Sequence, residues 1–153
     1  MNMPDGSDRS SQRPFRTSLT VRIGDINYGR HLANDALLGL LHEARLRFLA
    51  AHGFSETDCG GVGLILVEAH LAFKAQAFHG DELAIEVSVG ERRRTGFDLH
   101  YRVTRAGDGR EIAAATTAMA FFDYARNRVA RRPEAFARAF PEAAGDPAAA
   151  GPS

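Results

Sequence analysis

Apolar and polar residues alternate along several segments of the chain, and this period of two is typical of half-buried β-strands. The alternation is clearest in residues 15–23, 82–89 and 96–103. Residues 62–73 and 111–122 are instead apolar on both faces, as in buried strands. Segment 111–122 is rich in Ala, which favours helix, but Thr and Phe in the same segment favour extended chain. We therefore predict a strand there.

A period of 3.6 residues appears only once over a long stretch, in residues 36–51. The apolar positions cover a wide stripe, which predicts a largely enclosed helix. Asn34 and Asp35 are good N-cap residues, and Gly53 is placed to stop the helix in a left-handed conformation. Pro133 opens a second, short helix that runs to residue 140, and Asp108-Gly109 marks a tight turn.

The order of elements is therefore one strand, one long buried helix and then four strands joined by turns. This order predicts an α+β fold, an antiparallel β-sheet wrapped around one long central α-helix. The single domain should span residues 15–140. Residues 1–14 are polar and residues 141–153 are rich in Ala, Pro and Gly, so both segments are expected to be disordered tails.

Composition narrows the class of protein. The 153 residues suit one domain, and 19 basic residues balance 19 acidic ones, which argues against a general nucleic-acid binder. No stretch approaches the roughly 20 apolar residues of a membrane span. Cys59 has no partner and no apolar segment begins the chain, so we expect a cytoplasmic protein.

The densest polar segment, residues 24–34, lies between the first strand and the long helix. Unpaired backbone amides at a helix start can stabilise a developing oxyanion. A carboxylate such as Asp25 on the same loop can activate water or attack directly. The alternative is that Asp25 and Asn34 only cap and brace the loop.

Residues 22–49, RIGDINYGRHLANDALLGLLHEARLRFL, resemble the 4-hydroxybenzoyl-CoA thioesterase family of hotdog-fold enzymes. Asp25 stands in the position of the family's catalytic Asp, His31 and Asn34 follow in order, and residues 43–45 supply its Glu-Ala-Arg. Gly80-Asp81 matches a later Gly-Asp turn, so the resemblance covers residues 19–132. The chain departs from the family at Arg30, where the family has Gly, and at Ala33, where it has Asn.

The resemblance implies a hotdog fold and hydrolysis of an acyl-CoA thioester, with Asp25 as general base or nucleophile. Backbone amides near His31 and Leu32 would hold the thioester oxygen. His31 would orient Asp25 or the substrate, or else only bond the loop backbone. Glu43 is the second candidate carboxylate, the alternative being an ion pair with Arg47.

Substrate-binding roles are predicted for six further positions. Tyr28 would line the acyl pocket or pack over the loop, and Leu32 and Asn34 would contact the thioester end. Arg92, Arg93 and Arg94 form one dense cationic cluster that suits phosphates, and a second cluster consists of Arg126, Arg128, Arg131 and Arg132. Solvated surface positions are the alternative for both clusters. No metal or cofactor is implied.

The expected partner is an acyl-CoA, or the same thioester on an acyl carrier protein, and the expected assembly is a homodimer or homotetramer. Two other functions stay open. One is a hotdog hydratase acting on enoyl or hydroxyacyl thioesters, whose motif begins as Asp25-Ile26-Asn27 does, although Tyr28 replaces its Pro and His31 comes one residue late. A non-catalytic acyl-CoA binding protein would fit the altered positions Arg30 and Ala33.

Overall fold

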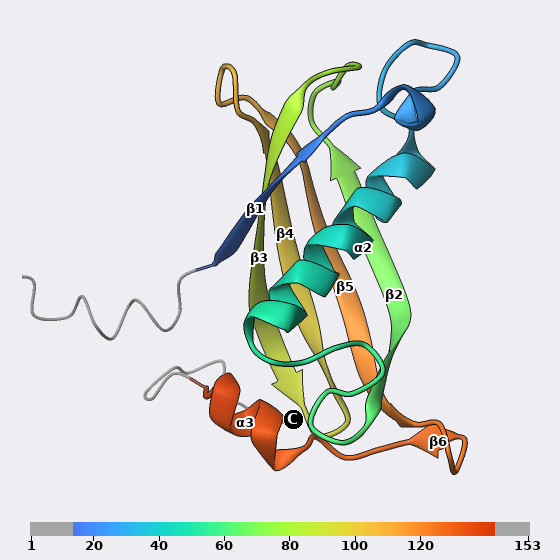
Figure 1. Cartoon of the computed structure of the whole chain (residues 1–153), viewed down its shortest axis with the longest axis vertical. Helices are drawn as coiled ribbons and strands as arrows, with labels where there is room; N and C mark the ends of the chain where they lie inside the picture. The colour runs from blue at the N-terminus through green and yellow to red at the C-terminus, as the bar shows by residue number, and fades with distance from the viewer. Residues whose placement is uncertain (1–13, 143–153) are drawn as a thin grey trace, which may run out of the picture.

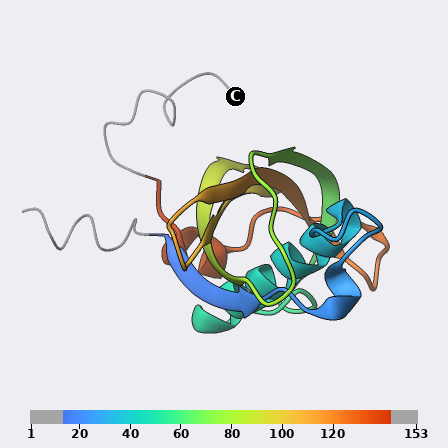
Figure 2. The ribbon, with the colours of Figure 1, turned by 90° about the horizontal axis from the view of Figure 1, so that it is seen from above.

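A single antiparallel sheet curls around one long helix in the computed structural model, which describes residues 14–142. Figure 2 shows the sheet from above, with α2 lying inside its curve. The elements in chain order are β1 (Phe15–Thr20), the 3-10 turn η1 (Ile23–Asp25), α2 (Asn34–Ala51), β2 (Gly63–Phe73), β3 (Glu82–Arg93), β4 (Gly96–Arg105), β5 (Glu111–Asp123), β6 (Arg128–Val129) and α3 (Glu134–Ala139). This arrangement confirms the predicted α+β architecture.

The strands lie in the order β1-β3-β4-β5-β2, and each neighbouring pair is antiparallel. Residues 111–123 are indeed a strand, and the Ala-rich segment pairs along its length with both β4 and β2. Within the described residues β2 pairs only with β5, so this 11-residue strand leaves one edge free. A one-residue bulge interrupts its pairing between Leu66 and Glu68.

The hydrophobic core lies between α2 and the concave face of the sheet. Alternation along β3, β4 and β5 turns every second side chain toward the helix, as the sequence pattern predicts. Rings from α2, β4, β5 and the α3 segment form one cluster, and α3 lies at the lower end of Figure 1. The outward side of α2 is open, since Leu38 is 39% and Leu46 38% exposed, so the predicted enclosure of the helix is wrong there.

Gly53 ends α2 with a φ of 78° and Gly109 turns the β4–β5 hairpin with a φ of 73°, so both predicted glycine roles are confirmed. The predicted N-caps are not. The N-cap is Ala33, without a side-chain bond, and Asn34 and Asp35 form the first helical turn. The backbone fixes this start, because the Ala33 amide donates to the Asp25 carbonyl over 3.0 Å.

The structure differs from the sequence prediction in four further places. β3 runs on to Arg93, η1 and β6 were not predicted, and Pro133 precedes α3 as its N-cap. The predicted tails, 1–14 and 141–153, lie almost entirely outside the described residues. Within those residues no helix is both long and apolar enough to cross a bilayer.

Candidate active site

The polar loop before α2 folds into a small hairpin whose base holds Asp25. Ile26 and Leu32 form an isolated antiparallel bridge, and the Asn27 amide donates to the His31 carbonyl over 3.0 Å. At the tip, the Arg30 amide donates to the Asn27 carbonyl over 2.9 Å. The side chain of Asn27 also accepts a 3.0 Å bond from the Gly29 amide. These bonds hold the loop in one conformation.

Arg30 at this tip has a φ of 67°, in the left-handed region that normally favours Gly. Gly adopts this conformation without steric cost, so a Gly would fit the Arg30 position with less strain. Among the described residues the only other non-glycine with positive φ is Asn127, a residue type that tolerates this conformation.

Asp25 is a half-buried residue whose backbone is bonded to the start of α2. The Arg22 amide donates to its Oδ2 over 2.9 Å, which fixes the carboxylate on η1. Its own carbonyl accepts the Ala33 amide, immediately before the first helical residue. Asp25 thus braces the loop, and its carboxylate still has lone pairs for a further donor.

Some backbone amides at the start of α2 donate hydrogen bonds within the chain, and others do not. The Leu32 amide donates to the Ala77 carbonyl over 2.8 Å, and the His31 amide reaches Asn27 Oδ1 only at 3.4 Å. Leu32 is therefore already paired within the chain. In residues 14–142 the amides of Asn34 and Asp35 have no acceptor, so the role of oxyanion donor fits them better.

His31 and Tyr28 make few contacts with their own chain. The His31 ring lies against Gly29, where an added Cβ would come within 2.8 Å of its Nε2. Within the described residues its ring has no hydrogen bond to Asp25 or to backbone. Tyr28 is fully exposed, at 105%, so the alternative that it packs over the loop is wrong.

Glu43 and Arg45, two residues of the Glu-Ala-Arg motif, point to opposite sides of α2. Glu43 is exposed and accepts a 3.0 Å ion pair from Arg47, whose guanidinium also donates to Thr17 Oγ1 on β1. Glu43 thus makes the predicted ion pair, and its catalytic role stays a prediction. Arg45 is only 6% exposed and faces the core.

Arg45 is the centre of a polar network that the sequence analysis did not identify. Its Nε donates to Glu56 Oε2 over 2.7 Å, and a second nitrogen donates to the Tyr101 hydroxyl over 3.1 Å. Tyr101 in turn bonds Thr117, and His42 bonds Glu56 from the solvent side. The network ties the loop before β2 to both the helix and the sheet.

The electrostatics of the network favour its charged form. Burial disfavours the Glu56 carboxylate, but hydrogen bonds from Arg45 and His42 outweigh this cost and hold the pKa of Glu56 below its usual value. The Arg45 position could have been recognised from sequence, because it lies three and four residues from Phe48, Leu49 and Leu41 on the apolar stripe.

The three arginines of the predicted phosphate cluster have different partners. Arg92 donates to the carbonyls of Phe140 and Gly90, over 2.9 and 2.8 Å, and so secures the end of α3. Arg93 forms a 2.7 Å ion pair with Asp98. Of these three arginines, Arg94 at the tip of the β3–β4 hairpin is the one that is exposed and has no carboxylate partner within the described residues.

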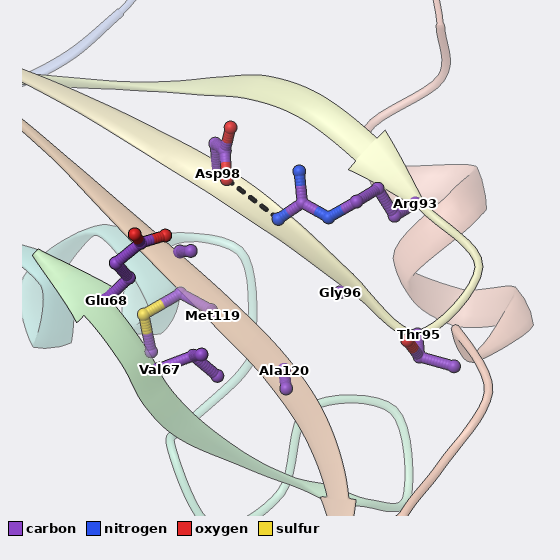
Figure 3. A pocket seen from close by; sticks show the side chains of 9 residues that line it. Val67, Glu68, Arg93, Thr95, Gly96, Asp98, Met119 and Ala120 are labelled. Atoms are coloured by element: carbon purple, nitrogen blue, oxygen red, sulfur yellow. Dashed lines mark hydrogen bonds and ion pairs between the residues drawn. The ribbon is translucent and has the colours of Figure 1, made fainter. Parts of the chain in front are cut away.

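A cavity of about 390 Å³ lies on the outer face of the sheet, next to the β3–β4 hairpin. Figure 3 shows Glu68 from β2 and the Arg93–Asp98 pair around it, above a floor of small residues. Gly96 belongs to this floor, and a Cβ there would lie 2.3 Å from the Met119 carbonyl oxygen. Two carboxylates against one guanidinium make this cavity a poor phosphate site.

Within one chain, η1, which ends at Asp25, and the β3–β4 hairpin, which holds Arg94, lie at opposite ends of the sheet (Figure 1). The Asp25 hairpin joins the segment after β2 through the Leu32–Ala77 bond. The Arg94 hairpin lies beside the start of β2, because Gly96 pairs with Ala120 and Ala120 pairs with Ile65. The structure therefore does not bring the predicted catalytic and phosphate-binding residues together in one protomer.

Neither a reactive thiol nor a metal site adds to this chemistry within the described residues. Cys59 is fully buried, and burial together with Asp58 raises the pKa of its thiol to about 12, so it is no nucleophile at neutral pH. In the part of the chain that the structure describes, no group of three or more His, Cys, Asp or Glu side chains could hold a metal ion.

A family model, described as the thioesterase-like superfamily, matches residues 21–140. No curated protein sequence matches the chain significantly. Several solved structures do share its fold.

One similar structure is a 1,4-dihydroxy-2-naphthoyl-CoA thioesterase from Synechocystis, with a TM-score of 0.75 and 22% identity, covering 83% of this chain and 95% of the other. A gentisyl-coenzyme A thioesterase aligns with a TM-score of 0.73 and 23% identity, over 82% and 99% of the two chains. A variant of 4-hydroxybenzoyl-CoA thioesterase in complex with 4-hydroxybenzoyl-CoA aligns with a TM-score of 0.75 and 20% identity, over 84% and 99%.

Proposed function

Because this chain belongs to the thioesterase-like superfamily, with the hotdog fold and thioester hydrolysis as its general chemistry, we propose that it hydrolyses an acyl-CoA to the free acid and CoA. The observation that carries the proposal is the placement of Asp25. Its carboxylate is fixed on η1 by the Arg22 amide, and its backbone carbonyl accepts the amide of Ala33, the residue before the unpaired amides of Asn34 and Asp35. A carboxylate and oxyanion donors at one helix start are what thioester hydrolysis needs.

The reaction can follow two routes at this carboxylate. As a general base, Asp25 takes a proton from water while the water oxygen attacks the thioester carbon. As a nucleophile, it forms a mixed anhydride, which water then hydrolyses. In both routes the amides of Asn34 and Asp35 stabilise the negative oxygen, and the C–S bond breaks to release CoA as a thiolate.

We further propose that the working unit is a homodimer, or a tetramer of such dimers, paired through β2. The free edge of β2 carries exposed apolar side chains, with Leu66 47% and Val67 62% exposed. An open edge of this length favours pairing with another strand. A second copy that pairs in antiparallel fashion places the start of its β2 beside the end of the first.

This pairing supplies the phosphate-binding residues that one protomer lacks. The partner's Arg94 hairpin, which lies at the start of β2, comes to the end that holds Asp25. Asp25 of one protomer and Arg94 of the other then form one site. Arg92 and Arg93 precede Arg94 in the same hairpin and are bonded within their own chain. Tyr28, exposed in the single chain, is placed to contact the acyl group.

A pair of mixed dimers tests the shared site. In the first, one chain carries Asp25→Asn and the other Arg94→Ala; in the second, one chain carries both substitutions and the other neither. Activity is measured at substrate concentrations below KM. If each site combines Asp25 of one chain with Arg94 of the other, the first dimer keeps one intact site and the second dimer keeps none. We expect the first dimer to be roughly ten-fold more active, because one charge-assisted bond is lost at the second dimer's only site with Asp25. A second dimer more active than the first would instead place Asp25 and Arg94 of the same protomer in one site.

The function itself is tested by release of thiol from a panel of aliphatic, hydroxylated and aromatic acyl-CoAs and one acyl carrier protein thioester. The named functions of the similar structures make hydroxylated aromatic acyl groups the first to try. Turnover of at least one CoA thioester supports the proposal. Hydration of an enoyl thioester without thiol release would favour the hydratase, and binding without any turnover would favour an acyl-CoA binding protein.

We assign the reaction to one domain, residues 15–140, and to the cytoplasm. A single buried thiol fits a reducing compartment.

A further inference from the structure

Arg30 carries an exposed guanidinium on a backbone that disfavours any side chain. Its φ of 67° is far less costly for Gly than for a residue with a Cβ. Nearby hydrogen bonds, including Arg30 amide to Asn27 carbonyl and Asn27 amide to His31 carbonyl, enforce this conformation. Strain that is kept in place by its surroundings is characteristic of functional positions.

Within the described residues the Arg30 guanidinium has no partner. In residues 14–142 it forms no ion pair and no side-chain hydrogen bond, while most arginines of the sheet, such as Arg93 and Arg105, are paired with carboxylates. Arg30 therefore stabilises nothing that the structure shows, although its position costs stability. An exposed, unpaired guanidinium is well suited to bind an anion in bidentate fashion.

The place of Arg30 in the hairpin separates it from the reacting carbonyl. Asp25 lies before the Ile26–Leu32 bridge at the base of the hairpin, and Arg30 lies in the turn beyond that bridge, where its amide donates to the Asn27 carbonyl. The long Arg30 side chain can reach further from the turn. In a CoA thioester the nearest permanent anions are the phosphates, which the pantetheine arm separates from the thioester. A cation set apart from the catalytic carboxylate matches that arrangement.

We propose that Arg30 is a specificity-determining residue that binds a phosphate of the CoA nucleotide. The inference rests on the proposed function and adds to it, since it distinguishes nucleotide-bearing thioesters from pantetheine thioesters. Arg30 acts from the protomer that supplies Asp25, whereas Arg94 acts from the partner.

Arg30→Gly separates this role from a purely structural one, because it removes the side chain and relieves the backbone at once. We expect the unfolding temperature to rise, KM for acyl-CoA to increase roughly ten-fold, and kcat to change less than two-fold. Arg30→Lys should keep KM within about three-fold of the wild-type value, since it keeps the charge. The matched control is Arg138→Ala on α3, which removes one exposed guanidinium elsewhere and should leave KM unchanged.

Three substrates with the same acyl group identify the phosphate. A KM effect of Arg30→Gly that disappears with acyl-3′-dephospho-CoA assigns Arg30 to the 3′-phosphate. An effect that persists there and disappears with acyl-pantetheine assigns it to the diphosphate. An unchanged KM for acyl-CoA, or an equal increase for acyl-pantetheine, would overturn the inference. Absence of turnover by the wild-type protein would instead overturn the proposed function.

Discussion

Asp25→Asn is expected to lower kcat by about 10²- to 10⁴-fold, the range that a positioned general base contributes. The amide Oδ1 of Asn can still accept the Arg22 amide bond that Asp25 Oδ2 accepts at 2.9 Å. The fold of η1 and the start of α2 should therefore persist. The amide can neither take a proton from water nor form a stable acyl intermediate, so the loss should fall on kcat and only weakly on KM.

The measurement is steady-state thiol release by the wild type and the variant, with circular dichroism and unfolding temperature as checks of the fold. Glu134→Gln is the matched control, because it removes one exposed carboxylate on α3, outside the proposed site. Its effect on kcat should stay within a few-fold. If Asp25→Asn kept more than a third of the wild-type kcat, Glu43 would become the leading candidate carboxylate.

Arg45→Ala is expected to lower the free energy of unfolding by about 3 kcal/mol, at the lower end of the range for breaking a buried ion pair. The lower end applies because Glu56 is 25% exposed and can be hydrated when its partner is lost. The Tyr101 hydroxyl would also lose one of its two buried bonds. Arg47→Ala is a close control on the same helix, since Arg47 is also ion-paired but 42% exposed, and should cost less than about 1 kcal/mol.

The same network predicts how stability depends on pH. The pKa of Glu56 is lower in the folded state than in the unfolded state, so its contribution is present above the unfolded pKa and is lost as the pH falls through the folded one. Urea unfolding of the wild type and Glu56→Gln at pH 7 and pH 3 should show a stability difference that shrinks at the lower pH. A difference independent of pH would contradict the assigned ion pair.

The fold could be predicted in detail because local pattern and tertiary environment agree. Alternation in β3 and β4 has one face on the core, and Gly53 supplies a conformation that other residues avoid. The Ala-rich β5 was ambiguous by propensity alone, since Ala favours helix. Pairing with strands on both sides decides it, and no local signal carries that information.

The candidate site was predictable in its residue types and less so in its contacts. Asp25 and the polar loop before the helix follow from the motif, whereas the hairpin within that loop does not. The Leu32 amide, however, is taken by Ala77, which lies 45 residues away in sequence. Arg92 was expected to face a ligand but binds the Phe140 carbonyl instead, near the end of the described chain. Both differences come from long-range backbone partners, which composition and spacing do not reveal.

Cys59 has a practical consequence for every experiment on this protein. It is the chain's single cysteine, fully buried, with a thiol pKa of about 12. A thiol-reactive dye should therefore report released CoA against almost no signal from the enzyme, because the thiolate is the reacting form. Because Cys59 should not react with such dyes, the protein is also suited to site-specific labelling at an introduced cysteine. One cysteine introduced on the free edge of β2 would carry the only accessible label, and its fluorescence could follow the association of two chains in solution.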